Sequence, residues 1–194
     1  MIEDEVRLPP RGGFPKWMIP VVVLILLANA LLLLGTVLWL TESPSAQDAF
    51  GPVSELKVAE PAPDFEVQML GGETVALADL KGRPVWLSFW ATWCAPCRAE
   101  MPEVLAANVE AQKLGIRFIA VDVAEPETEV SNYLKRSGYT ALPAALDPDG
   151  AVSSEYSVYN LPTHVFIDSA GKLHHIKSGE LTRSEFLEIA RELK

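Results

Sequence analysis

The longest uncharged segment of the chain constrains its folding more than any other feature. No Asp, Glu, Lys or Arg lies between Lys16 and Glu42, and the intervening sequence, WMIPVVVLILLANALLLLGTVLWLT (17–41), is almost entirely apolar. As a helix it exceeds the roughly 20 residues that cross the hydrocarbon core of a bilayer, about 30 Å thick. The segment therefore predicts a transmembrane helix, with Trp17 and Trp39 at the two membrane interfaces.

The charges on either side of this span predict its orientation. Arg7, Arg11 and Lys16 precede it, whereas the next basic residue after it is Lys57. Because basic residues are retained on the cytoplasmic side, we expect residues 1–16 to form a cytoplasmic tail. The rest of the chain would then lie outside, on the far side of a membrane that the helix crosses once.

A cleaved signal peptide is the alternative to an anchor. Its apolar region is usually shorter, about 7 to 15 residues, and ends at a small-residue cleavage site, for which SPSAQDA (43–49) offers only weak candidates. We therefore expect an uncleaved signal anchor over 17–41. The Pro-, Ser- and Ala-rich sequence that follows predicts a linker over 42–60, and residues 61–194 remain for a folded domain.

Charge and composition restrict the class of protein. The 16 Lys and Arg residues against 26 Asp and Glu give a formal net charge of -10, which provides no long-range attraction to nucleic acid phosphates. We therefore exclude nucleic acid as a partner. Hydrophobic residues make up 49% of the chain, enough for one compact core in a domain of ordinary size.

Hydrophobic patterns in the C-terminal part predict alternating strands and helices. A hairpin is expected around Gly71-Gly72, and RPVWLSFW (83–90) has the continuous apolar run of a strand buried on both faces. The other predicted elements are a helix over 95–113, a strand over 115–123, a helix over 126–138, a strand and turn within 142–150, a hairpin over 163–179 and a helix over 181–194. This order predicts an α/β fold with a mixed central sheet flanked by helices.

The two cysteines of the chain, Cys94 and Cys97, lie in WATWCAPCRAEMP. A bridge between them closes too short a loop to stabilise the fold much, and a structural zinc site would need a second ligand pair. A redox role fits better. Cys94 falls at a strand-to-helix junction, where free N–H groups stabilise a thiolate, and Pro96 suits the first turn. We expect Cys94 to be the exposed nucleophile and Cys97, deeper in the helix, the resolving thiol.

The sequence FWATWCAPC (89–97), followed by Pro102, resembles the active-site strand and helix of thioredoxins. Across 61–194, the motifs PAPDF, the Gly-Gly hairpin, DLKGRPVWLSFWATWCAPCRAEMP, LPT and VFIDSAGK resemble the membrane-anchored TlpA/ResA/CcmG group of redoxins. The resemblance implies a thioredoxin-like fold and thiol:disulfide oxidoreductase activity. It also implies a single-pass protein of the bacterial inner membrane, with the C-terminal domain in the periplasm. It implies a redox-active disulfide between Cys94 and Cys97, with no other cofactor and no metal.

The resemblance also assigns the substrate-binding residues. It implies a cis peptide bond before Pro162, opposite the redox pair, which would leave the Leu161 backbone free to pair with a substrate strand. Thr163, Trp93 and Pro96 complete this predicted surface. For Trp93, as for Trp90, we favour a place in the core and the wall of the active site over direct reading of the substrate.

Glu100 is the third catalytic residue that the resemblance implies. It lies one helical turn past Cys97, where a carboxylate would take or return the thiol proton. Ser88 departs from the thioredoxin pattern, in which a buried Asp occupies this position. The departure leaves Glu100 as the expected proton acceptor.

The implied partners are proteins that carry disulfides, such as apocytochrome c or oxidase assembly factors, and a membrane electron donor of the DsbD/CcdA type. Two alternatives remain open. A peroxiredoxin-like peroxidase would ordinarily carry a PxxxTxxC motif, which this chain lacks. A Sco-like copper-delivery protein would use a CxxxC pair and a histidine, for which His164 is the candidate. Otherwise His164, His174 and His175 are interpreted as strand residues.

Overall fold

The structure, a computed structural model, describes residues 17–41 and 56–193 and divides into two compact units, the N-terminal helix and the C-terminal domain. The predicted tail 1–16 and the linker as far as residue 55 lie outside the described residues, as does the side chain of Trp39. The two units are described separately below.

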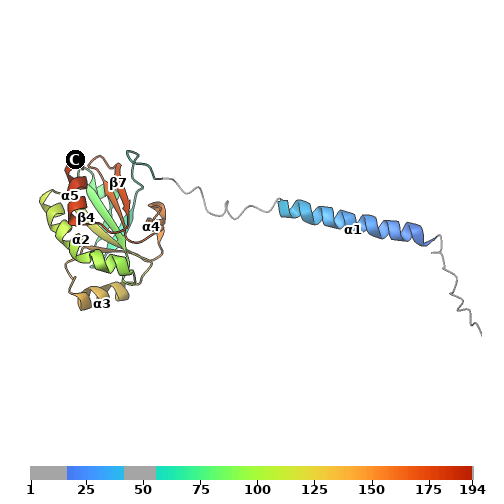
Figure 1. Cartoon of the computed structure of the whole chain (residues 1–194), viewed down its shortest axis with the longest axis horizontal. Helices are drawn as coiled ribbons and strands as arrows, with labels where there is room; N and C mark the ends of the chain where they lie inside the picture. Colours follow the sequence, from blue (N-terminus) through green and yellow to red (C-terminus); the bar gives the residue numbers. More distant parts are fainter. Residues whose placement is uncertain (1–16, 42–55, 194) are drawn as a thin grey trace, which may run out of the picture. The chain divides into compact units, whose positions relative to one another are not determined.

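Helix α1 (Met18–Thr41) forms the first unit (Figure 1). Its window Ile19–Thr36 has a mean hydropathy of 2.5, and none of that window is buried against protein. At about 1.5 Å per residue a helix of this length matches the thickness of a bilayer core. The predicted apolar helix is therefore confirmed, and it is long and apolar enough to cross a membrane.

A seven-stranded mixed sheet organises the C-terminal domain, in the order β2-β1-β5-β4-β3-β6-β7. Its strands are β1 (Glu66–Met69), β2 (Thr74–Ala76), β3 (Val85–Trp90), β4 (Arg117–Val123), β5 (Ala144–Asp147), β6 (Thr163–Ile167) and β7 (Leu173–Ser178). The three central strands β3, β4 and β5 are parallel, and every other pairing is antiparallel. The sheet confirms the predicted α/β architecture.

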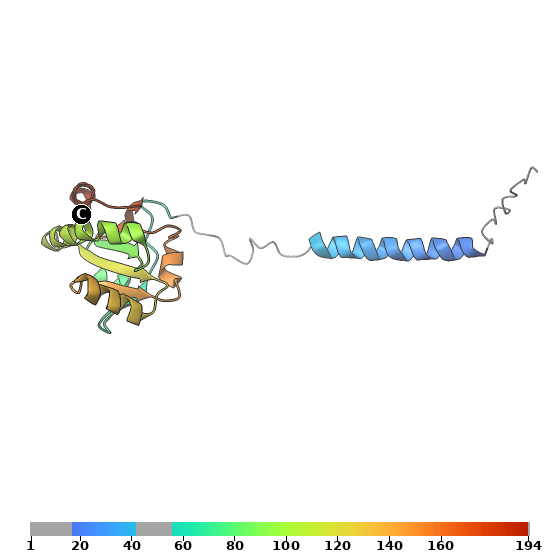
Figure 2. The same cartoon turned by 60° about the horizontal axis from the view of Figure 1, so that its bottom comes forward.

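Helices cover both faces of this sheet. They are α2 (Ala95–Lys113), α3 (Glu127–Ser137), α4 (Ala151–Glu155) and α5 (Arg183–Glu192), with a short 3-10 helix, η1, at Leu77–Leu80. Figures 1 and 2 show α2 and α5 side by side. Helices α2, α3 and α5 pack on one face of the sheet, and η1 and the α4 region pack on the other.

The sequence did not predict η1 or α4, because helices of one turn carry no apolar period. The Asp147 carboxylate accepts the N–H groups of Val152 and Ser153 in α4, at 3.0 and 2.8 Å.

Strand β3 explains why the domain has two hydrophobic clusters. Its side chains alternate across the sheet: Trp86 and Trp90 join the cluster under α2, α3 and α5, while Val85, Leu87 and Phe89 join the cluster on the α4 side. All six residues of the strand are buried. The predicted strand with apolar residues on both faces is confirmed. The strand ends at Trp90, shortly before Cys94.

The folded domain begins earlier than residue 61, where the sequence predicted the linker 42–60 to end. The Ala59 N–H donates to the Leu173 carbonyl at 2.7 Å, and the Glu60 carbonyl accepts the Leu173 N–H at 2.9 Å. These contacts are between backbone groups. The composition of the segment therefore gave no sign of them.

Helix α3 ends as predicted at Gly138, whose φ of 78° lies in the left-handed region. A Cβ there meets no atom within 4 Å, so a substitution would be opposed by the backbone conformation alone. We expect Gly138→Ala to lower the free energy of unfolding by about 1 kcal/mol, measured by urea denaturation. Gly71→Ala is the matched control, because Gly71 is equally open and its φ lies outside that region. An equal loss of stability in both variants would contradict this account.

Candidate active site

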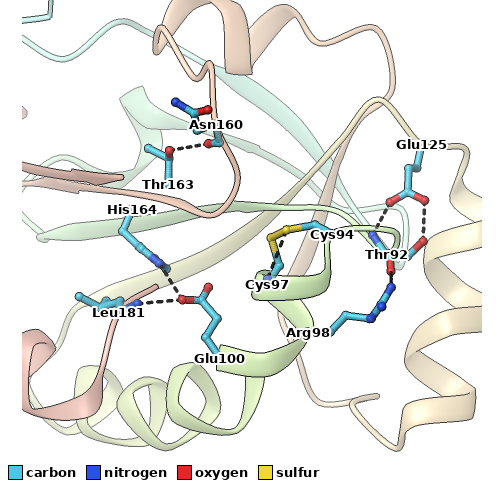
Figure 3. Close-up of a disulfide and its surroundings, with 10 residues drawn as sticks. All are labelled: Thr92, Cys94, Cys97, Arg98, Glu100, Glu125, Asn160, Thr163, His164 and Leu181. Carbon is cyan, nitrogen blue, oxygen red and sulfur yellow. Dashed lines mark hydrogen bonds and ion pairs between the residues drawn. A yellow bond between two sulfur atoms is a disulfide. The ribbon is translucent and has the colours of Figure 1, made fainter. Parts of the chain in front are cut away.

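The two cysteines form a disulfide at the start of α2, with Cα atoms 5.3 Å apart (Figure 3). Cys94 is the N-cap of the helix, and its Sγ accepts the Cys97 N–H at 3.2 Å. Pro96 occupies the first turn, where a missing N–H leaves no hydrogen bond unmade. The sulfur of Cys94 therefore lies among the free N–H groups of a helix N-terminus, which stabilise a thiolate.

Cys94 is more exposed than Cys97, as predicted, but both cysteines are buried. Cys97 is fully buried, whereas Cys94 is 4% exposed, so the expectation of an exposed Cys94 is wrong for the disulfide form. The reason is that both cysteines belong to the cluster under α2, against which Leu161 packs. The open surface of the site is formed instead by Pro96 and by Trp93. Trp90 is buried in the core as expected, whereas Trp93 is 64% exposed, so its expected place in the core is wrong.

The segment before β6 provides the opposite wall of the site. The Leu161-Pro162 bond is cis, as expected. Within residues 56–193, no hydrogen bond engages the N–H or carbonyl of Leu161. Thr163 is buried and donates its hydroxyl to the Asn160 carbonyl at 2.7 Å. Its side chain therefore shapes the turn, while the Leu161 backbone is left without a hydrogen bond in the described part of the chain.

Glu100 is buried one helical turn past Cys97, with 5% of its surface exposed. Its Oε2 accepts the Leu181 N–H at 2.8 Å and lies 3.3 Å from Nε2 of His164. Figure 3 shows the carboxylate between these partners and the turn that carries Cys97. Glu100 is therefore part of the buried interior of the site rather than a solvated surface residue.

His164 is one of the residues of this site whose contacts the sequence analysis missed. It is a strand residue, as expected, but it is completely buried, with the Trp86 indole N–H 3.4 Å from Nδ1 and Glu100 next to Nε2. In the register of β3 and β6 it pairs with Ser88, so both side chains lie on the α2 face. A histidine inside the apolar run of a strand was the available signal, but its partners depend on the strand pairing.

A second carboxylate holds the loop that leads into α2. Glu125 accepts both the backbone N–H and the hydroxyl of Thr92, the latter at 2.6 Å, and the Arg98 guanidinium donates to the Thr92 carbonyl at 2.9 Å. Thr92 lies two residues before Cys94. These contacts fix the backbone just before Cys94.

Asp122 lies beside Glu125 at the end of β4 and is completely buried. In register it pairs with Trp90 on the α2 face, and neither of its oxygens has a hydrogen-bond partner in the described part of the chain. Burial, and next the negative charge of Glu125, raise the pKa of Asp122 to about 8. The carboxyl is therefore protonated at neutral pH.

The geometry weakens both alternatives to disulfide exchange. Both ring nitrogens of His164 are already engaged, by Trp86 and Glu100, which removes the third ligand of the copper-delivery alternative. The Thr92 hydroxyl, two residues before Cys94, donates its proton to Glu125, so that proton is not free to polarise a peroxide beside Cys94.

Comparison with known proteins assigns the family. The AhpC/TSA family profile matches residues 58–176. The chain belongs to the AhpC/TSA family. The thiol-disulfide oxidoreductase ResA of Bacillus cereus (strain ATCC 10987) is 33% identical over 147 residues, which cover 76% of this chain and 84% of that protein. ResA of Bacillus subtilis (strain 168) is 37% identical over 123 residues, or 63% and 68% of the two chains.

Solved structures agree with this assignment. A putative thiol:disulfide interchange protein DsbE from Chlorobium tepidum has a TM-score of 0.61 at 29% identity, covering 71% of this chain and 97% of its own. An exposed lipoprotein thioredoxin from Streptococcus pneumoniae (strain TIGR4) has a TM-score of 0.62 at 33% identity, covering 68% and 100%. This redoxin therefore has the thioredoxin-like fold and is a thiol-disulfide oxidoreductase. Its apolar N-terminal helix fits a membrane-anchored bacterial protein.

The buried acid predicts how the stability of the domain depends on pH. Because the pKa of Asp122 is about 8 in the folded chain against a usual 3.8, folding favours the protonated form, and stability is lost as pH rises from about 4 to about 8. We expect Asp122→Asn to raise the free energy of unfolding by about 2–4 kcal/mol at pH 7 and by less at pH 5. Urea denaturation at several pH values measures this, with the exposed Asp79→Asn as control. A gain independent of pH would refute the ionisation argument.

Proposed function

We propose that this redoxin is a membrane-tethered reductant of disulfides in proteins of the bacterial envelope. The observation that carries the proposal is the Cys94–Cys97 disulfide at the N-terminus of α2, where the Cys94 sulfur accepts the Cys97 N–H. After reduction the same N–H donor stabilises a thiolate on Cys94, and a thiolate is the attacking species in disulfide exchange.

The proposed reaction has two exchange steps. The Cys94 thiolate attacks one sulfur of a client disulfide, forms a mixed disulfide and releases the other client sulfur as a thiolate. The Cys97 thiol then loses its proton and attacks the Cys94 sulfur, which releases the second client thiolate and forms the Cys94–Cys97 disulfide. Two electrons pass from the dithiol to the client, and the released client thiolates take up protons from the site or from water.

Glu100 and the cis-proline segment serve these steps in the proposal. Glu100 takes the proton of Cys97 during the second step, a role supported by its burial one turn along the same helix. The unbonded backbone of Leu161 pairs with an extended client segment next to the disulfide, in the manner of strand addition. Trp93 and Pro96 offer the client an exposed apolar surface on the other side of the sulfurs.

The direction of electron flow and the identity of the partners rest on the resemblance to the TlpA/ResA/CcmG group. Stabilising the Cys94 thiolate by itself favours the reduced pair, and so would make the redoxin an oxidant. Reduction of clients therefore requires a membrane donor, which we take to be a dithiol protein of the DsbD/CcdA type that returns the disulfide to the dithiol. Apocytochrome c and oxidase assembly factors are the clients we propose.

The proposed location is the inner membrane, with α1 as an uncleaved single-pass anchor and the C-terminal domain in the periplasm. The basic residues Arg7, Arg11 and Lys16 before the span support this orientation. An oxidising compartment is also where client disulfides arise.

Removal of the resolving thiol tests the proposed exchange directly. In membranes that contain the full chain, Cys97→Ser is expected to accumulate mixed disulfides with client proteins, because Cys94 attacks but no second thiol releases it. The complexes would appear as larger species on non-reducing gels and disappear with dithiothreitol. A trapped client with a haem-attachment CxxCH motif would place the reaction in cytochrome c maturation.

Two variants make the trapping experiment decisive. Cys94→Ser is expected to trap far less than Cys97→Ser, and the double variant Cys94→Ser/Cys97→Ser nothing. If Cys97→Ser traps no more than the double variant while the wild-type pair is reduced in cells, Cys94 is not the attacking thiol and the proposed reaction fails.

Protease accessibility tests the proposed orientation. In intact spheroplasts, external protease is expected to digest the chain after about residue 42, because that part lies outside the membrane, while an N-terminal tag stays protected. Protection of the C-terminal domain would contradict the periplasmic location. Release of a soluble form that lacks the N-terminal helix would show a cleaved signal instead of an anchor.

A further inference from the structure

Three polar side chains from three elements form a continuous buried chain of contacts beside the redox pair. Trp86 comes from β3, His164 from β6 and Glu100 from α2, and at least 95% of each residue's surface is buried. The Trp86 Nε1 and His164 Nδ1 atoms are 3.4 Å apart, and His164 Nε2 and Glu100 Oε2 are 3.3 Å apart. The proposed proton acceptor Glu100 is thus connected to the core of the sheet.

The donor on Trp86 determines where the imidazole carries its proton. An indole N–H only donates, so Nδ1 of His164 must accept. A neutral imidazole then has its single proton on Nε2, which donates it to the Glu100 carboxylate. The tautomer follows from the partner of the opposite nitrogen.

The two donors to Glu100 meet the same oxygen. Oε2 accepts the Leu181 N–H at 2.8 Å as well as the His164 Nε2–H. In Figure 3 the other oxygen, Oε1, lies on the side of the carboxylate toward Cys97. With Oε2 held on one side by two N–H groups, the carboxylate cannot rotate freely, and Oε1 stays directed to the Cys97 side.

The charged groups around this chain already have partners. Lys177 of β7, the register neighbour of His164, forms an ion pair with Glu185 of α5. Glu103, further along α2, accepts the backbone N–H of Arg183. His175 of β7 lies against the ring of Phe166. Of the acids on these packed elements, Glu100 is the one that His164 contacts.

We propose that His164 is a positioning residue of the exchange reaction: with its tautomer fixed by Trp86, it orients Glu100 so that Oε1 receives the Cys97 proton. The inference rests on the proposed function and deepens it. His164 touches neither the client nor the sulfur atoms in this role. Its effect is confined to the second exchange step, in which Cys97 attacks Cys94 and the client thiolate leaves.

The two exchange steps are separable with 5,5′-dithiobis(2-nitrobenzoate) and the reduced full chain in detergent. Attack by Cys94 releases one coloured thiolate, and attack by Cys97 on the resulting mixed disulfide releases a second. Stopped-flow absorbance from pH 5 to pH 9, about the range over which perturbed thiols titrate, then gives a rate and a pH profile for each phase.

We expect His164→Leu to slow the second phase by about 10- to 100-fold, as for the loss of one hydrogen bond to a charged group, and to change its pH profile. The first phase should change by less than about twofold, because its rate depends on Cys94. His164→Gln, which retains an N–H donor near Nε2, should recover most of the lost rate. His174→Leu, on β7 and partly exposed, is the matched control and should leave both phases unchanged.

Combination with Glu100→Gln separates positioning from packing. If His164 acts through Glu100, then His164→Leu adds little to the slowing already caused by Glu100→Gln. A second phase that is unchanged in His164→Leu, or slowed equally by His164→Gln and additively with Glu100→Gln, would overturn the proposal. Absence of both phases in the wild-type chain would instead overturn the proposed exchange function.

Discussion

The antiparallel pairing of β3 with β6 is the contact on which the site depends. Phe89 near the end of β3 pairs with Thr163 at the start of β6. Because the redox helix follows β3 and the cis-proline segment precedes β6, the pairing brings Cys94 and Leu161 to the same edge of the sheet. Farther along the same two strands, the pairing places Ser88 beside His164. His164 thereby lies on the α2 face of the sheet, where Trp86 also lies. A shift of one residue in this register would turn His164 to the other face.

The sequence was sufficient to predict the features whose causes are local. The start of α2 follows from Cys94 and Pro96. The bounds of α3 follow from Pro126 and Gly138, and the buried strand β3 follows from its continuous apolar run. The apolar helix α1 follows from its length and lack of charge. The resemblance supplied the cis bond before Pro162 and the disulfide, which the residues alone left open.

The features that could not be predicted depend on contacts between distant segments. Glu125 and Thr92, or His164 and Glu100, are brought together only by the order of strands in the sheet. The low exposure of Cys94 has the same origin, since Leu161 packs against the cluster that contains it. The local sequence indicates which side chains can donate, accept or transfer a proton. Which residues they contact depends on the order of the strands in the sheet.

The Trp86–His164 contact also has a consequence for how the sequence can change over time. Both side chains are completely buried, so replacing His164 with an apolar residue would leave the indole N–H without an acceptor, and replacing Trp86 with Phe would free His164 from its fixed tautomer. Either single change leaves a buried polar group without its partner, while a joint change of Trp86 to Phe and of His164 to an apolar residue removes the donor and the acceptor together. Positions 86 and 164, although 78 residues apart, should therefore vary as a pair among redoxins. Such covariation would indicate, from aligned sequences, that β3 and β6 pair in this register.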